Sequence, residues 1–191
     1  MSQPATVSVR IPQVTIGGNV DRHYKEAWED LTADGAPFSW SNIEIRNHMT
    51  RVYDSAPANL IDIWSMSVAH GEKDYLVYGD ERISYGEAHL KVNCLASYLH
   101  GLGIRHGDRV AILMRNYPEW VLTYWAVASL GAVAVGMNAW WTGLEIEFAV
   151  DDCEPKAIVC DQERLEKLTP HLSTLRSEGN IHVVAVRTKA D

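Results

Sequence analysis

The fold is decided by the stretch Gly101-Leu-Gly-Ile-Arg-His-Gly-Asp-Arg-Val-Ala-Ile-Leu-Met-Arg-Asn-Tyr-Pro-Glu-Trp120 together with Gly131-Ala-Val-Ala-Val-Gly-Met-Asn138. Residues 110–114 are apolar on both faces, which is typical of a strand in the middle of a parallel sheet. Pro118 suits the first turn of a helix, where its missing N–H costs nothing, and Asn116 is the expected cap. Gly131 ends that helix before a second apolar strand at 133–137. The stretch therefore predicts a βαβ unit.

Strands and helices alternate on both sides of this unit. Ser84 with Glu87, and Thr142 with Glu145, each form the spacing of a capping box and mark two helix starts. Such alternation predicts an α/β fold, with a mostly parallel sheet covered by helices on both faces. We expect a hairpin over 75–83, helices at 84–101, 118–130, 142–152 and 162–168, strands at 157–160 and 181–186, and a connector at 170–180.

The first part of the chain is less regular. Residues 1–20 are polar and contain Pro and Gly, so we expect an irregular arm. A short helix should follow, capped by Asp21, then extended pieces near 43–53 and a helix after Pro57. We therefore expect two domains: a leader with a short helix at 1–50 and an α/β subdomain at 51–191.

Composition and charge exclude several classes of function. The 191 residues carry a net charge of −8, whereas a nucleic-acid surface needs clustered Lys and Arg. Cys94, Cys153 and Cys160 are odd in number and widely spaced, which argues against a disulfide framework or a zinc site. We expect them to be buried thiols of a cytoplasmic protein. Residues 120–144 carry no charge, but Gly131 and Gly136 divide them into a helix and a strand, so we expect no membrane span.

Several short sequence motifs of this chain occur together in one known family. The segment from about 70 to 168 resembles the opening part of the adenylate-forming enzymes, which include acyl-CoA synthetases, luciferases and the adenylation domains of peptide synthetases. Residues 35–64 resemble the lead-in of fatty-acyl and aryl-acid CoA ligases. The matching words are Ile83-Ser-Tyr-Gly-Glu87, Gly101–Val110, Asn116-Tyr-Pro-Glu119, Gly131-Ala-Val-Ala-Val135, Asn138, Thr142 and Glu145.

The resemblance implies an enzyme with two half-reactions. A carboxylate attacks the α-phosphate of ATP to give an acyl-adenylate and pyrophosphate, and the thiol of CoA then displaces AMP. Mg²⁺ would neutralise the phosphate charge. The implied cofactors are ATP, Mg²⁺ and CoA, and the implied substrate is a fatty or aryl carboxylic acid. Two alternatives stay open: a carrier-protein thiol in place of CoA, and a non-catalytic α/β module for binding or assembly.

The family's catalytic motifs do not occur in this sequence. There is no Ser/Thr-Gly-rich phosphate loop, no metal motif of the Tyr-Gly-x-Thr-Glu kind and no C-terminal catalytic Lys. In the family these motifs lie beyond the point that matches Asp191. We therefore expect a fragment that ends before the phosphate loop, is inactive alone in pyrophosphate exchange, and pairs with the remaining C-terminal part of the enzyme. An exposed apolar surface would also allow a homodimer.

Candidate site residues follow two of the predicted strands, and none of them is catalytic or a metal ligand. Asn138, Ala139 and Trp140 follow strand 133–137, at the sheet edge where ligands bind in open α/β folds. The resemblance places the matching loop beside the pantetheine channel of CoA; the alternative is that the tryptophans only cover the sheet edge. Arg164 and Lys167 follow strand 157–160, and the resemblance suggests contact with CoA phosphates; the alternative is a solvated helix face.

Overall fold

The computed structural model describes residues 20–173 and 181–189. Nearly all of the expected arm and much of the expected connector at 170–180 lie outside those residues. The chain forms two compact units, Met1–Pro57 and Ala58–Asp191. The boundary expected after residue 50 falls inside the second strand of the first unit.

The first unit contains one helix and one hairpin. Helix α1 (Val20–Thr32) begins one residue before Asp21, so Asp21 lies within the helix and is not its cap. The expected extended pieces are β1 (Trp40–Ile45) and β2 (His48–Tyr53), which pair antiparallel from Trp40 with Tyr53 to Ile45 with His48. Two residues with positive φ join them, as a tight two-residue hairpin turn requires.

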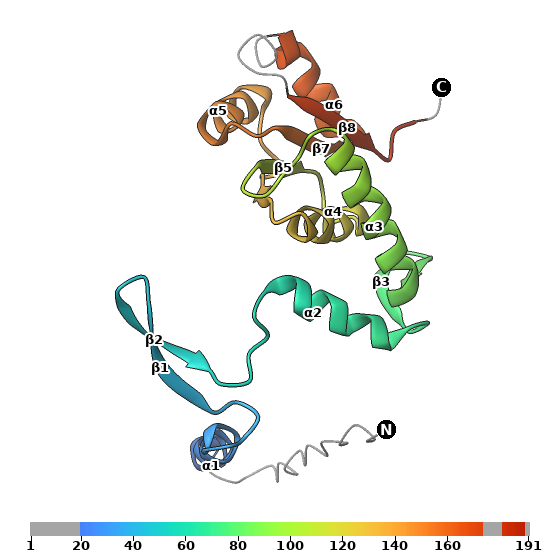
Figure 1. Ribbon diagram of the computed structural model, residues 1–191. Helices are drawn as coiled ribbons and strands as arrows, with labels where there is room; N and C mark the ends of the chain where they lie inside the picture. The colour runs from blue at the N-terminus through green and yellow to red at the C-terminus, as the bar shows by residue number, and fades with distance from the viewer. Residues whose placement is uncertain (1–19, 174–180, 190–191) are drawn as a thin grey trace. The chain divides into compact units, whose positions relative to one another are not determined.

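The second unit is built on a four-stranded sheet in the order β6-β5-β7-β8, with all neighbours parallel. Its layers are visible in Figure 1, with α5 and α6 on the upper side of the sheet and α3 and α4 on the lower side. The expected fold class is confirmed. In chain order the elements are α2 (Leu60–Ser67), η1 (Val68–His70), β3 (Asp74–Tyr78), β4 (Glu81–Ser84), α3 (Tyr85–Gly101), β5 (Arg109–Leu113), α4 (Pro118–Ser129), β6 (Val133–Gly136), α5 (Gly143–Cys153), β7 (Ala157–Asp161), α6 (Gln162–Leu168), η2 (Thr169–His171) and β8 (His182–Val186).

Two apolar cores lie on opposite faces of this sheet. Successive strand residues point to opposite faces, so Val110 and Ile112 of β5 join one core while Ala111 and Leu113 join the other. Helices α3 and α4 cover the first core, and α5 and α6 cover the second. The four β5 residues are completely buried, which explains why the strand has no polar alternation.

In the second unit the helix starts follow the sequence with one correction. Both expected capping boxes are present: Ser84 with Glu87 at α3, and Thr142 with Glu145 at α5. The expected cap Asn116 was wrong, because Tyr117 occupies the N-cap position of α4, without a side-chain capping hydrogen bond, and Pro118 lies in the first turn. The N–H of Tyr117 donates to the carbonyl of Arg115 at 2.7 Å, and this sharp bend leaves Asn116 one residue short of the helix.

The cysteines do not all behave as expected. Cys160 is buried on β7, where desolvation raises the pKa of its thiol to about 12, so the thiol stays protonated. Cys94 is exposed, which corrects the expectation of buried thiols, because it lies on the outer face of α3 two residues after buried Val92. No helix within 20–173 and 181–189 is long and apolar enough to cross a bilayer.

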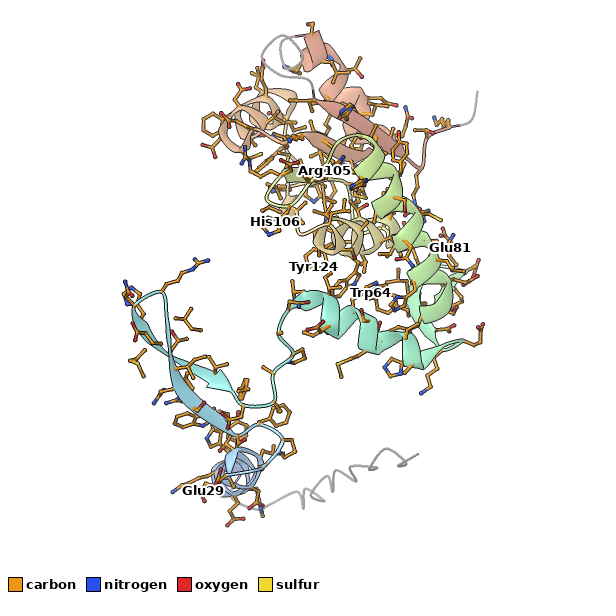
Figure 2. The ribbon with its side chains drawn as sticks, viewed as in Figure 1. Glu29, Trp64, Glu81, Arg105, His106 and Tyr124 are labelled. Carbon is orange, nitrogen blue, oxygen red and sulfur yellow. The ribbon has the colours of Figure 1, made fainter. Side chains whose placement is uncertain are left out.

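An aromatic cluster joins α2 to the helices and strands that follow it in the second unit. Trp64, 4% exposed, stacks on the imidazole of His89 at 3.9 Å and on the indole of Trp125 at 4.9 Å. The indole N–H of Trp125 donates to the hydroxyl of Tyr75 at 2.8 Å. Nε2 of His89 lies 3.0 Å from the hydroxyl of Ser67. Trp64 thus joins α2 to α3, α4 and β3, and Figure 2 labels its position on α2.

His89 should make stability depend on pH. Burial lowers the pKa of His89 from its ordinary value of 6.5, so the folded chain favours the neutral ring. As pH falls through about 6.5, the unfolded chain binds the proton first, and the free energy of unfolding decreases until the lower folded pKa is reached. We expect urea denaturation to show this loss between neutral and mildly acidic pH. The His89→Gln variant should show a shallower loss, and an unchanged loss would contradict the prediction. His100→Gln, at an exposed position of α3, is the control.

Candidate functional site

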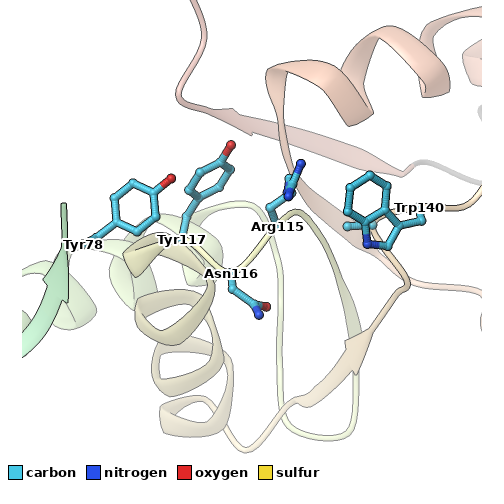
Figure 3. A pocket seen from close by; sticks show the side chains of 6 residues that line it. Tyr78, Arg115, Asn116, Tyr117 and Trp140 are labelled. Atoms are coloured by element: carbon cyan, nitrogen blue, oxygen red, sulfur yellow. The ribbon is translucent and has the colours of Figure 1, made fainter.

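A pocket of about 460 Å³ opens at the carboxyl ends of β5 and β6. We call it the edge pocket, and it is lined by Tyr78, Arg115, Asn116, Tyr117, Ala139 and Trp140. Figure 3 shows the two tyrosines at one end and Trp140 at the other, with Arg115 between them. The residues come from three separate segments, which the parallel sheet and the β3–β4 hairpin bring together. This is the sheet edge where open α/β folds bind ligands.

Trp140 forms one wall of the edge pocket. Its side chain is 68% exposed, and the guanidinium of Arg115 lies 4.5 Å from the centre of its ring. The backbone N–H of Trp140 donates to Oδ1 of Asn138 at 2.9 Å, so the Asn138 side chain shapes the loop. An exposed indole beside a cation leaves one face available to a planar ligand.

Trp141 has a different environment from Trp140. It is half-buried and packs against the core that α5 and α6 cover. Its N–H donates to the carbonyl of Asn138 at 3.2 Å. The two tryptophans therefore differ in environment: Trp141 packs on the core, and Trp140 is exposed at the edge pocket.

A buried ion pair lies beneath the loop. Asp161 ends β7, and its carboxylate accepts from the backbone N–H of Arg164 at 2.9 Å and from the backbone N–H of Arg115 at 3.0 Å. Nη1 of Arg164 lies 3.3 Å from Oδ2 of Asp161. Nε of Arg164 donates to the carbonyl of Ala139 at 2.7 Å. The ends of three strands are thus joined through one aspartate and one arginine.

The two cations predicted after β7 have different surroundings. Arg164 is 0% exposed, so the alternative of a solvated helix face is wrong for this residue. Lys167 has a side chain that is 33% exposed and an ammonium 3.4 Å from the carbonyl of Trp141 and 3.8 Å from Glu163. Within the part of the chain that the structure describes, neither residue lines the edge pocket.

Arg187 supports the opposite wall. The rings of Tyr78 and Tyr117 meet edge to face at 5.5 Å, and the guanidinium of Arg187 lies 5.1 and 4.9 Å from their centres. Arg187 also donates to the carboxylates of Glu81 and Glu119, each at 2.8 Å. This hydrogen bonding holds the pKa of Glu81 below its ordinary value. The tyrosine wall is therefore fixed by a charged network.

Sequence reasoning missed most of this pocket. Asn138, Ala139 and Trp140 were predicted because they follow a strand, and of these Ala139 and Trp140 line the pocket. The same signal was present for Arg115 and Tyr117 after β5. Tyr78 and Arg187 gave no such signal, because only the folded chain places the β3–β4 hairpin and the end of β8 beside the edge pocket. The arrangement can bind a planar group between aromatic rings and an anionic group at Arg115.

The described residues hold no cluster of three or more His, Cys, Asp or Glu able to bind a metal ion. The pocket also lacks a paired nucleophile and base: its one cation is Arg115, and its other polar side chains are an amide and two phenols. Its chemistry within this chain is therefore binding and orientation, with the aromatic faces and the guanidinium as the recognising groups.

Fold and pocket together define an open α/β protein with a ligand site at the carboxyl ends of parallel strands. A family model described as AMP-binding enzyme matches residues 65–190, which is more than half of the chain. The chain therefore belongs to the AMP-binding enzyme family. The resemblance to adenylate-forming enzymes that the sequence motifs indicated is confirmed.

Individual relatives agree with this assignment. Acetyl-coenzyme A synthetase of Chlorobaculum tepidum is 30% identical over 168 residues, 86% of this chain and 25% of that protein. 4-Coumarate–CoA ligase 4 of Arabidopsis thaliana is 37% identical over 97 residues, 51% of this chain and 16% of that protein. The crystal structure of the anthranilate CoA ligase AuaEII in complex with anthranoyl-AMP superposes with a TM-score of 0.63 at 27% identity, covering 67% of this chain and 25% of that one. The matched part spans about a sixth to a quarter of the length of these proteins.

Proposed function

We propose that this chain is part of an AMP-forming acid–thiol ligase, which activates a carboxylic acid with ATP and transfers the acyl group to CoA. The observation that carries the proposal is the match of residues 65–190 to the AMP-binding enzyme family. A carboxylate is a poor electrophile, and adenylation gives it a good leaving group. ATP, CoA and Mg²⁺ are the partners of such a reaction, with Mg²⁺ supplying charge neutralisation at the phosphates.

In this proposal the edge pocket contacts CoA or the acyl chain. Asn138 and Ala139 shape the loop, Trp140 offers an aromatic face, and Arg115 offers a cation to a phosphate or carboxylate. Lys167 is partly exposed and able to turn toward a phosphate, whereas Arg164 is buried and directed at the loop. The two tyrosines complete a pocket with aromatic rings at both ends.

The acid in this proposal is a fatty or aryl carboxylic acid. Relatives are named for 4-coumarate, long-chain fatty acids and acetate, so the family name alone does not select one. The lead-in at residues 35–64 favours the fatty-acyl and aryl branch. A carrier-protein thiol in place of CoA, or a non-catalytic binding module, are the competing functions. An intact mass of the native protein well above 21.4 kDa, together with a reading frame that encodes a Ser/Thr-Gly-rich loop downstream of residue 191, would favour the ligase.

The partner surface in this proposal lies on α5 and the free edge of β6. A groove of about 580 Å³ there is lined mainly by apolar side chains, including Met137 and Trp141. Leu144 and Phe148 are 72% and 73% exposed. Large exposed apolar patches mark interaction sites, so the remaining part of the enzyme or a second copy would cover this face.

The three free cysteines agree with a cytoplasmic protein.

Trp140→Ala tests the role of the edge pocket in the complete enzyme. Removing the indole should raise the KM for CoA or for the acid by about 5- to 10-fold, the loss of roughly 1–1.4 kcal/mol expected for a truncated aromatic contact. Steady-state kinetics with each substrate varied in turn measures the effect. Chain folding should be unaffected, because the side chain is 68% exposed.

Tyr98→Ala is the matched control for Trp140→Ala. Tyr98 is likewise an exposed aromatic residue, at 54%, but it lies on α3 outside the edge pocket and outside the proposed partner surface. Its removal should leave both KM values within about twofold of the original, as is usual for surface substitutions. Equal effects of the two substitutions, or no effect of Trp140→Ala on either KM, would remove the edge pocket from substrate binding.

A further inference from the structure

Arg164 is a fully buried charged residue, and burying its guanidinium carries a desolvation penalty that an apolar residue would avoid. It is the bulkiest fully buried side chain among the described residues, on a helix face where Leu168 fills the next turn with an apolar group. Burying a charged pair costs several kcal/mol per ion, and apolar residues of similar volume often stabilise a protein more. A buried ion pair at such a place therefore calls for an explanation other than core packing.

The contacts of the pair supply that explanation. Asp161 receives the N–H of Arg115 at 3.0 Å, and Nε of Arg164 donates to the carbonyl of Ala139 at 2.7 Å. Both bonds go to backbone groups of residues that line the edge pocket. The pair thus fixes the end of β5 relative to the loop after β6. That relation sets where Arg115 lies against the ring of Trp140, 4.5 Å from its centre.

Direct contact of Arg164 with a ligand is disfavoured by the same geometry. Its side chain is 0% exposed; Nη1 faces the carboxylates of Asp161 at 3.3 Å and Glu163 at 2.8 Å, and Nε faces the Ala139 carbonyl. Nη2 is buried and has no hydrogen-bond partner within the described residues, so Nε alone makes the bond to the loop. A ligand phosphate would have to open the loop before it reached this guanidinium.

We propose that Arg164 is a positioning residue, which acts through Asp161 and Ala139 to hold the Asn138–Trp140 loop against Arg115 and does not touch the ligand. The name of the ligand rests on the proposed function, whereas the positioning role does not. Binding groups must be held within about 0.5 Å of their productive places, and supporting hydrogen bonds supply that precision. Arg164 therefore pre-organises the edge pocket before any ligand arrives.

Amide hydrogen exchange, followed by NMR on the 191-residue chain without ligand, tests this role. Exchange reports local opening separately for each backbone N–H. In Arg164→Met, the N–H groups of Trp140 and Trp141 should exchange at least about tenfold faster, while those of Ile112 and Val159 in the sheet change by less than about threefold. Arg164→Lys keeps the charge but lacks the planar fork, so it should show the same selective increase to a smaller extent. Glu166→Gln, an exposed change on α6, is the control.

The outcomes separate positioning from a merely structural role. A selective increase in the loop supports the proposal, and it does so whether or not the complete enzyme proves to be a ligase. A uniform increase across loop and sheet in both Arg164 variants would mean that Arg164 only stabilises the fold. Unchanged exchange at Trp140 and Trp141 would mean that the loop is held by other contacts. If Arg164→Met does not fold, the Arg164→Lys pattern decides between these outcomes.

Discussion

Replacement of Asp161 by alanine lowers the free energy of unfolding by about 3–5 kcal/mol, the cost of breaking a buried ion pair by removing one partner. Asp161 is 3% exposed, and its loss leaves the fully buried guanidinium of Arg164 with the half-exposed Glu163, 2.8 Å from Nη1, as its remaining carboxylate partner. It also removes the acceptor for the N–H groups of Arg115 and Arg164, so α6 loses its cap. Urea denaturation followed by circular dichroism measures the change.

Two further variants make the Asp161 result specific. Glu166→Ala removes a carboxylate from the exposed face of the same helix, where the side chain of Gln162 donates to it at 2.9 Å, and should change stability by less than about 0.5 kcal/mol. Adding Arg164→Met to Asp161→Ala should recover part of the loss, because the buried guanidinium that has lost its buried partner is then replaced by an apolar group. A loss below 1 kcal/mol for Asp161→Ala, or simple additivity in the double variant, would mean that the pair is not buried as described.

Trp64→Ala should be similarly damaging, with a loss of about 3–5 kcal/mol for a large aromatic removed from a core. The indole is 4% exposed and lies between the rings of His89 and Trp125. Without it, both rings lose a stacking partner and α2 loses the one buried residue that fastens it to the sheet unit. Thermal and urea unfolding of the variant measure the loss, and near-ultraviolet circular dichroism should record the change around the remaining rings.

Met66→Ala is the control for Trp64→Ala. Met66 lies on the same helix, but its side chain is 68% exposed. The change should therefore cost less than about 0.5 kcal/mol. Comparable losses for the two variants would show that α2 itself, and not the stacking of Trp64, determines the stability.

The sheet unit could be predicted from sequence because local signals there agree with one another. Residues 110–114 are apolar without alternation, and β5 is buried on both faces. Ser84 and Thr142 mark the starts of α3 and α5, because each forms the capping box that its spacing to a glutamate predicts. The prediction that Asn116 caps α4 was wrong for a physical reason. Asn116 is a good capping residue, but the bend after Arg115 places the helix start one residue later.

The edge pocket was only partly predictable. The rule that loops follow parallel strands at one edge identified Asn138, Ala139 and Trp140. Which residues face them depends on strand order, and β6 lies beside β5, so Arg115 is the neighbour of Trp140. Arg164 was surrounded in sequence by acidic residues, which indicated a solvated face, yet those charges include its buried partner Asp161. Charge composition does not reveal burial, because a paired charge and a solvated one have the same local sequence.

The most direct test of the central claim is product analysis with the polypeptide that the complete gene encodes, supplied with ATP, Mg²⁺, CoA and a panel of fatty and aryl acids. An AMP-forming acid–thiol ligase releases AMP and pyrophosphate only when a suitable acid is present, and it forms the acyl-CoA thioester in equal amount. We predict this result for at least one acid of the panel. Acid-dependent release of ADP and phosphate, or no acid-dependent turnover of ATP with any acid, would contradict the assignment.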